Sequence, residues 1–286
     1  KPRNPGCSKE MSHVVAVANQ KGGVGKTTTV VNLAAVLASL GKTVLVLDLD
    51  PQANATSGLG VEPKAGVSLY PALIDTRVVD DVIVGTSVEN VNLIPAEVNL
   101  AGAEIEIARM PDQLHGLSKV LEPIRHAKVF DFIVVDCPPS LGILMTNALA
   151  AADSVLVPMQ CEYYAMEGLS VIAGLVERMR TGGANPKLFI EGIVMTMYSR
   201  TKLADEVVEQ VRSHYGDLVY GTVIPRSVRA GEAPSFGLPV VAYAPSSPVS
   251  EGYFNFGAEF LDRFNIRASL DRKVDLPPQP ASSNLA

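Results

Sequence analysis

A glycine-rich loop between a strand-like and a helix-like segment is the feature that most constrains this chain. The loop spans residues 18–28, apolar residues 14–18 lead into it, and residues 30–40 repeat apolar side chains at helical spacing after it. Backbone N–H groups converge on an anion at such a turn, and the positive end of the helix dipole favours negative charge there. The pattern predicts a phosphate-binding loop that belongs to an α/β fold.

The side chains of this loop have the chemistry that a nucleoside triphosphate needs. The glycines let the backbone curl around phosphate oxygens, Lys26 can reach the β- and γ-phosphates, and the Thr27 hydroxyl can hold Mg²⁺. We therefore expect ATP and Mg²⁺ as cofactors. The residues expected to bind the phosphates are Lys21, Gly22, Gly23, Val24, Gly25, Lys26, Thr27 and Thr28.

The loop departs from the common P-loop pattern, which has a glycine five places before the Gly-Lys pair. Here Gln20 occupies that place, and Lys21 is followed by two glycines. This arrangement resembles the deviant Walker A box of the ParA/MinD family. The resemblance implies that Lys21 reaches across a dimer to the partner's nucleotide. Two ATP molecules would then lie face to face at the interface, and Gly22 would lie where the backbones approach.

Composition favours a single large domain and sets limits on its partners. The chain has 286 residues, 47% hydrophobic and 19% charged, and no linker long enough to separate two cores. Its net charge of −6 argues against a uniformly basic nucleic-acid binder but not against a local basic patch. The three cysteines, Cys7, Cys137 and Cys161, have neither paired-ligand spacing nor an even count, which is typical of a reducing cytoplasm. No apolar run reaches the roughly 20 residues needed to span a bilayer.

Strand-like and helix-like segments alternate along the chain. This rhythm predicts a doubly wound, mostly parallel α/β sheet with helices on both faces. Ligands of such sheets bind at the carboxyl ends of the strands. After the phosphate loop we expect strands at 43–49, 93–95, 130–135, 154–158 and 188–195, and helices at 104–128 (broken near 110–111), 141–151 and 166–180.

Aspartates follow two of the predicted buried strands. Asp136 fits the Walker B role, orienting Mg²⁺ through a bound water, although a helix N-cap or turn carboxylate is common at this position. Asp48 and Asp50 both end the second strand, and either carboxylate could orient an attacking water. The run 48–52 resembles the ParA switch I motif, which implies that Asp50 is catalytic together with Lys21 and Lys26. Asp48 would then support the Mg²⁺ site or the phosphate loop without contacting the nucleotide directly.

The resemblance covers residues 11–264, including segments 160–168 and 224–229, and it points to the chromosomal branch of the ParA family. It implies an ATP-dependent homodimer that binds double-stranded DNA without sequence preference on the nucleoid. A ParB-type partner at centromere-like sites would stimulate slow ATP hydrolysis and release the DNA. The adenine would lie near Met197 and Pro225. Residues 11–266 would form the ATPase domain, with 1–10 a polar extension and 267–286 a disordered tail.

Four basic residues are the candidates for DNA contact. Arg200 and Arg229 have the spacing of that branch's DNA contacts, and Lys202 and Arg226 lie nearby. Guanidinium groups suit phosphate oxygens because their planar donors can engage two at once. Contacts of this kind carry no base specificity. Glycine at position 231 departs from the larger residue that is usual in the family near this point.

Three other functions share the same loop chemistry. A MinD-like membrane-cycling ATPase would end in a basic amphipathic helix, whereas residues 271–286 contain three prolines. An iron–sulfur carrier of the nitrogenase iron-protein type would need cysteines at ligand spacing. A module that holds nucleotide without hydrolysis would not need Lys21, Lys26, Thr27, Asp50 and Asp136 together. We therefore favour a cytoplasmic, nucleoid-associated ATPase without stable membrane insertion.

Overall fold

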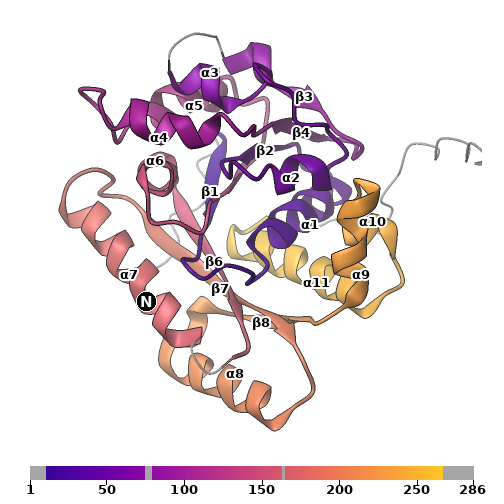
Figure 1. Ribbon diagram of the computed structural model, residues 1–286. Coiled ribbons are helices and arrows are strands. Elements are labelled where there is room, and N and C mark those ends of the chain that lie inside the picture. Colours follow the sequence, from indigo (N-terminus) through magenta and orange to yellow (C-terminus); the bar gives the residue numbers. More distant parts are fainter. Residues whose placement is uncertain (1–10, 75–78, 163–164, 267–286) are drawn as a thin grey trace, which may run out of the picture.

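The computed structural model describes residues 11–74, 79–162 and 165–266. All strands of these residues belong to one twisted sheet (Figure 1). The predicted N-terminal extension and C-terminal tail lie outside these residues. The sheet has eight strands in the order β3-β4-β2-β5-β1-β6-β7-β8, and every neighbouring pair is parallel except β3 with β4. The strands are β1 His13–Val17, β2 Val44–Asp48, β3 Val84–Gly85, β4 Val91–Ile94, β5 Phe132–Asp136, β6 Ser154–Gln160, β7 Phe189–Tyr198 and β8 Val219–Pro225.

Helices cover both faces of the sheet. One layer contains α1, α2 and α9 to α11, and the other contains α3 to α8 (Figure 1). The α-helices are α1 Lys26–Ser39, α2 Asn54–Gly58, α3 Leu69–Leu73, α4 Leu100–Ile107, α5 Gly116–Ala127, α6 Ile143–Ala151, α7 Ala165–Thr181, α8 Lys202–Tyr215, α9 Val228–Glu232, α10 Val240–Tyr243 and α11 Pro248–Arg263. Short 3₁₀ turns occupy Val79–Val82, Gly216–Leu218 and Ala233–Phe236.

The alternation of side chains along the central strands creates two separate cores. In β5, Phe132 and Val134 pack under α1 and α11, whereas Ile133 and Val135 pack under the opposite layer. All of these side chains are fully buried. Strands buried on both faces read as continuous apolar runs, which is why the sequence shows them so clearly.

The predicted doubly wound α/β fold is confirmed, with small shifts at the ends of elements. The region predicted as helix 104–128 divides into α4 and α5, and the break around Met110 and Pro111 lies between them. Three long elements after β7 were not predicted individually, namely α8, β8 and α11. Their signals are present: Thr201 and Ser247 both cap a helix N-terminus by accepting a backbone N–H.

The register of the central strands places the predicted site residues at one edge. Asp136 at the end of β5 lies opposite Asp48 at the end of β2 and opposite Val17 at the end of β1. The phosphate loop leaves β1 at this same edge. The carboxyl ends of three neighbouring strands therefore meet where the sequence places the ligand site.

Candidate nucleotide site

The phosphate loop joins β1 to the first turn of α1. Gly25 has φ +85° and forms the N-cap of α1, a conformation that side chains other than glycine rarely adopt. Its carbonyl accepts the first helical bond, from Thr29 N over 2.8 Å. The N-terminal N–H groups of α1 have no side-chain cap, so they face the position that a phosphate would take.

Lys26 lies inside the curl of the loop. Its side chain is buried, and its Nζ donates a hydrogen bond to the carbonyl oxygen of Lys21 over 3.2 Å. Burial lowers the pKa of Lys26, and the charges of Asp136 and Asp50 partly oppose that effect. The ammonium group is thus held in place before any phosphate arrives.

Asp136 is a buried carboxylate without partners. It is 1% exposed, and neither oxygen has a hydrogen-bond partner among the described residues. Burial and then the charge of Asp48 hold its pKa well above the usual range. The Thr27 hydroxyl lies near enough to offset this shift in part, without completing a hydrogen bond of ordinary geometry. A buried carboxylate of this kind needs a cation or a hydrogen-bond donor to offset the free-energy cost of its burial.

Asp48 and Asp50 differ sharply in their surroundings. Asp48 is fully buried, and its carboxylate accepts hydrogen bonds from Thr56 N at 2.8 Å, the Thr56 hydroxyl at 2.7 Å and Asp50 N at 3.2 Å. Asp50 is half-buried, and its carboxylate accepts one bond from Gln52 N at 3.0 Å. The free oxygen of Asp50 is the one available to a water molecule. The bonds of Asp48 go to its own segment and not to the phosphate loop, so its expected bracing of that loop is not seen here.

Lys21 lies at the outer rim of the loop. Its Nζ forms an ion pair with Glu162 Oε2 over 2.7 Å, with both side chains substantially exposed. Asn19 fixes the backbone below it, because Asn19 Oδ1 accepts from Lys21 N and Asn19 Nδ2 donates to the carbonyl of Pro158. The rim lysine therefore has a backbone held by Asn19 and a solvent-facing ammonium group paired with Glu162.

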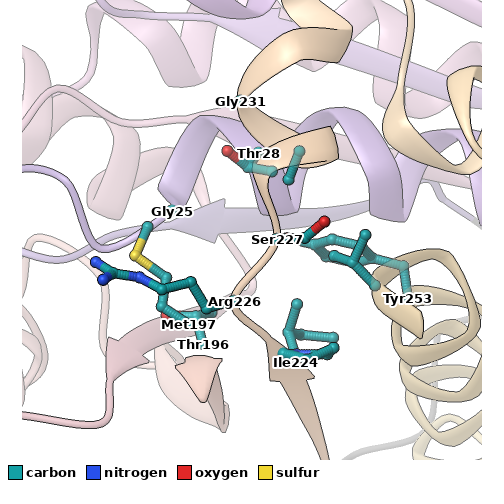
Figure 2. A pocket seen from close by; sticks show the side chains of 12 residues that line it. Gly25, Thr28, Thr196, Met197, Ile224, Arg226, Ser227, Gly231 and Tyr253 are labelled. Atoms are coloured by element: carbon teal, nitrogen blue, oxygen red, sulfur yellow. The ribbon is translucent and has the colours of Figure 1, made fainter. Parts of the chain in front are cut away.

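A cavity of about 270 Å³ adjoins the loop, and Figure 2 shows its lining. Met197 and Pro225, predicted from separate segments to contact adenine, both line it together with Gly25 and Thr28 of the loop. Tyr253 of α11 closes another side. Met197 has φ +51°, a conformation that is rare outside glycine. It costs free energy and persists only where the surrounding structure enforces it. Mostly apolar walls beside a phosphate loop suit a flat base.

The four basic candidates lie on two adjacent segments, the β7–α8 connection with the first residue of α8 and the β8–α9 connection with α9. Arg200 and Lys202 follow β7, whereas Arg226 and Arg229 follow β8, and all four side chains are exposed. Arg226 N donates to the carbonyl of Tyr198 over 2.9 Å, which joins the two segments directly. Arg229 forms an exposed ion pair with Glu232 over 2.9 Å.

The segment after α2 touches the segment after α9. A Cβ atom built on Gly237 would lie 2.8 Å from Gly60 Cα, and one built on Gly60 would lie 3.0 Å from the Gly237 carbonyl oxygen. Ser87 donates from its hydroxyl to the carbonyl of Gly237. Side chains at either glycine would separate the two segments.

Two connections in the site were missed from the sequence. Thr56 holds Asp48, and the Thr196 hydroxyl donates to the carbonyl of Val24 in the phosphate loop over 2.8 Å. Tyr253, a wall of the cavity, was also missed. Each depends on residues far apart in the sequence, so no local pattern marks them.

Among the described residues, no helix combines the length and the apolar character that crossing a bilayer requires. Fold and loop together define a P-loop nucleotide-binding protein of the doubly wound α/β class.

Comparisons with known proteins identify the family. Residues 12–190 match the model of an AAA domain family. The chain is 50% identical over 252 residues to the sporulation initiation inhibitor protein Soj of Bacillus subtilis, covering 87% of this chain and 98% of Soj. It is 45% identical over 252 residues to the chromosome partitioning protein ParA of Caulobacter vibrioides, covering 87% and 94%. The chain belongs to the Soj/ParA family of chromosome-partitioning ATPases.

Solved structures share the fold. A cobyrinic acid a,c-diamide synthase from Mycobacterium smegmatis, with bound ATP analog and magnesium, is 35% identical with a TM-score of 0.77, covering 89% of this chain and 96% of that one. The cell division ATPase MinD of Pyrococcus furiosus is 25% identical with a TM-score of 0.73, covering 88% and 99%.

Proposed function

We infer that this chain is a Mg²⁺-dependent ATPase that uses its nucleotide state to control binding to DNA during partitioning. The observation that carries the inference is Asp136. Its carboxylate has no partner, lies at the ends of the central strands, and is close enough to Lys26 for their charges to affect each other. Such an arrangement is costly in the empty protein and useful only with a ligand.

The donor set fits Mg²⁺ with a nucleotide. Mg²⁺ prefers oxygen ligands and usually takes one or two from the protein, the rest coming from phosphates and water. Thr27 would hold the ion directly and Asp136 through water. When bound, the ion would neutralise charge on the β- and γ-phosphates.

Hydrolysis rests on Asp50, Lys26 and Lys21. The half-buried Asp50 carboxylate would orient an attacking water toward the γ-phosphate, and Lys26 would stabilise the phosphate charge from inside the loop. Lys21 would act on the nucleotide of a second copy, after leaving Glu162. Slow basal turnover is expected, since a switch must hold its ATP state long enough to act.

DNA binding would use the two basic segments after β7 and β8. In an ATP-bound dimer the exposed side chains of Arg200, Lys202, Arg226 and Arg229 would be present twice, which multiplies a weak, salt-sensitive contact with phosphates. Arg226 and its neighbours Ser227, Ala230 and Gly231 line the cavity proposed for adenine, so nucleotide could influence the segment after β8 directly. A ParB-type partner would accelerate hydrolysis and end the DNA-bound state, which would place the protein on the nucleoid only while ATP is bound.

The test is binding of a random-sequence DNA duplex with ATP, ADP or no nucleotide, over a series of salt concentrations. We expect binding with ATP only, and its loss in Arg200→Ala/Arg229→Ala. Arg178→Ala/Arg180→Ala removes the same charge from the exposed surface of α7 and serves as the control. Equal loss in both double variants would mean that only net charge matters, and DNA binding in every nucleotide state would contradict the switch.

A further inference from the structure

The β2–α2 segment, residues 48–56, carries Asp50, and the buried hydroxyl of Thr56 joins the two ends of this segment. We propose that Thr56 is a positioning residue for ATP hydrolysis, which sets the place of Asp50 through the carboxylate of Asp48. The inference rests on the ATPase function proposed above, in which Asp50 orients the attacking water.

The Thr56 hydroxyl makes two hydrogen bonds in different directions. It donates to Asp48 Oδ2 over 2.7 Å and accepts from Ala96 N over 3.0 Å. Thr56 is fully buried, so water cannot replace either partner. Asp48 ends β2 and Ala96 follows β4, so one side chain connects the ends of two neighbouring strands to α2.

Asp48 passes this constraint on to Asp50. Its Oδ2 is occupied by the Thr56 hydroxyl and backbone N–H, while its Oδ1 accepts from Asp50 N over 3.2 Å. Rotation of the Asp48 carboxylate would break bonds at both ends. The three bonds also compensate for burying the group, because hydrogen bonds from Thr56 oppose the rise in its pKa that burial causes.

Asp50 itself makes only local hydrogen bonds among the described residues, whereas the preceding Leu49 is attached to the sheet, because its N–H donates to the Asp136 carbonyl over 3.0 Å. The Asp50 carboxylate accepts only from Gln52 N, two residues further on, and the Asp50 carbonyl accepts from Ala53 N. These bonds shape the turn, but they do not attach the residues after Leu49 to the sheet. Ala53 has φ +53° at the start of α2, an unusual conformation that costs free energy and persists only where the surrounding structure enforces it. Beyond Leu49, the Thr56–Asp48 pair is the hydrogen-bonded attachment that closes this segment back onto the strand ends.

Small displacements in an active site have large kinetic effects. A catalytic group displaced by about 1 Å can cost a hundredfold in rate, because the reaction needs aligned atoms. Thr56 contacts neither the phosphate loop nor the cavity through any hydrogen bond seen here, so its loss should leave ATP binding nearly intact. The predicted signature is a fall in kcat without a matching change in ATP affinity.

The experiment compares Thr56→Val, Thr56→Ser and Thr43→Val in the full chain. Valine removes the hydroxyl at nearly constant shape, whereas serine keeps it. Thr43, at the opposite end of β2, is a matched control because its hydroxyl also contacts an aspartate. The Thr43 hydroxyl donates to the Asp131 carboxylate over 3.3 Å and accepts from the Asp131 N–H over 3.0 Å. We measure kcat, the affinity for a fluorescent ATP analogue, and the melting temperature.

We expect Thr56→Val to lower kcat about tenfold or more, with ATP affinity within about threefold of the wild type. Thr56→Ser should recover most of the rate, and Thr43→Val should lose stability but not kcat. A wild-type kcat in Thr56→Val, or an equal fall in Thr43→Val, would overturn the inference. If Thr56→Val does not fold, Thr56→Ala replaces it under the same criteria.

Amide hydrogen exchange separates this inference from the proposed function. In the protein without nucleotide, residues 49–56 should exchange faster in Thr56→Val than in Thr43→Val. Unchanged exchange in that segment would contradict the positioning role. A wild-type protein that hydrolyses no ATP would overturn the proposed function, while the exchange data would still decide whether Thr56 holds the segment.

Discussion

The Thr196 hydroxyl donates a hydrogen bond to the carbonyl oxygen of Val24, over 2.8 Å and across 172 residues of sequence. Both residues are buried, so no water can replace the bond. The bond attaches the middle of the phosphate loop to the end of β7, next to Met197 in the wall of the cavity. The loop and the proposed base site are thereby held at a fixed distance.

Thr196→Val should weaken nucleotide binding. A buried carbonyl left without its donor costs about 1–3 kcal/mol, and part of that cost will appear as a several-fold loss of affinity for ATP. The remainder will lower the melting temperature. Titration with a fluorescent ATP analogue measures the first effect and calorimetry the second. Thr196→Ser, which keeps the donor, is the control, and undiminished affinity in the valine variant would show that the bond does not position the loop.

Asp136→Asn should have opposite effects on stability and on ligand response. Without nucleotide, the neutral amide removes a buried acidic group whose pKa is raised by burial, so the melting temperature should equal or exceed that of the wild type. The stabilisation that Mg-ATP gives the wild type should largely disappear, because the oxygen pair that holds the hydrated ion is lost. Thermal shift with ATP, with and without Mg²⁺, measures both. A large Mg²⁺-dependent shift in the variant would remove Asp136 from the metal site.

Glu162→Gln should favour the ATP-bound dimer. In the proposed dimer Lys21 would have to leave Glu162 to reach the second nucleotide, and an exposed ion pair of this kind is worth about 0.2–1 kcal/mol. Dimerisation with ATP should therefore tighten by up to about fivefold, an effect that high salt removes. Sedimentation velocity measures the dimer constant. Lys21→Gln should reduce dimerisation instead, and weaker dimerisation in Glu162→Gln would mean that the pair assists assembly.

Glu191→Gln should change how stability depends on pH. Glu191 is fully buried, bonded to the Tyr220 hydroxyl and 4.0 Å from Arg263, yet burial outweighs these partners and raises its pKa to about 7. The folded state therefore holds a proton that the unfolded chain releases near its ordinary value. The contribution of protonated Glu191 to the stability of the fold is present at low pH and is lost as pH rises through 7.

Between pH 5 and pH 8 the free energy of unfolding of the wild type should fall by about 2–3 kcal/mol relative to that of the glutamine variant. Urea unfolding at a series of pH values measures it. His13 acts in the opposite sense, because burial lowers its pKa to about 4 and its contribution is lost as pH falls below the ordinary value of 6.5. Comparing variant with wild type at each pH cancels the effect of His13. Parallel pH profiles would show that Glu191 stays charged in the fold.

The sequence was sufficient for the central sheet because its strands are buried on both faces and appear as apolar runs, as β2 and β5 do. The sequence also predicted that Lys26 and Asp136 lie at the same edge of the sheet, because the carboxyl ends of neighbouring parallel strands meet there. It did not reveal the role of Thr56, because its bonds to Asp48 and Ala96 span loops whose conformation no local pattern determines. Helix α8 was not predicted although its signals are local: Ala204, Val207, Val208 and Val211 recur at helical spacing after the capping Thr201.

The contact between Gly60 and Gly237 limits how this chain can change over evolution or in the laboratory. One glycine follows the segment that carries Asp50, and the other follows the helix that carries Arg229. A mutation that adds a side chain at either place would move the segment of Asp50, proposed for hydrolysis, and a segment proposed for DNA contact in the same event. Neither activity could then be tuned at these two positions without a compensating change in the other, so engineering of one property should begin elsewhere in the fold.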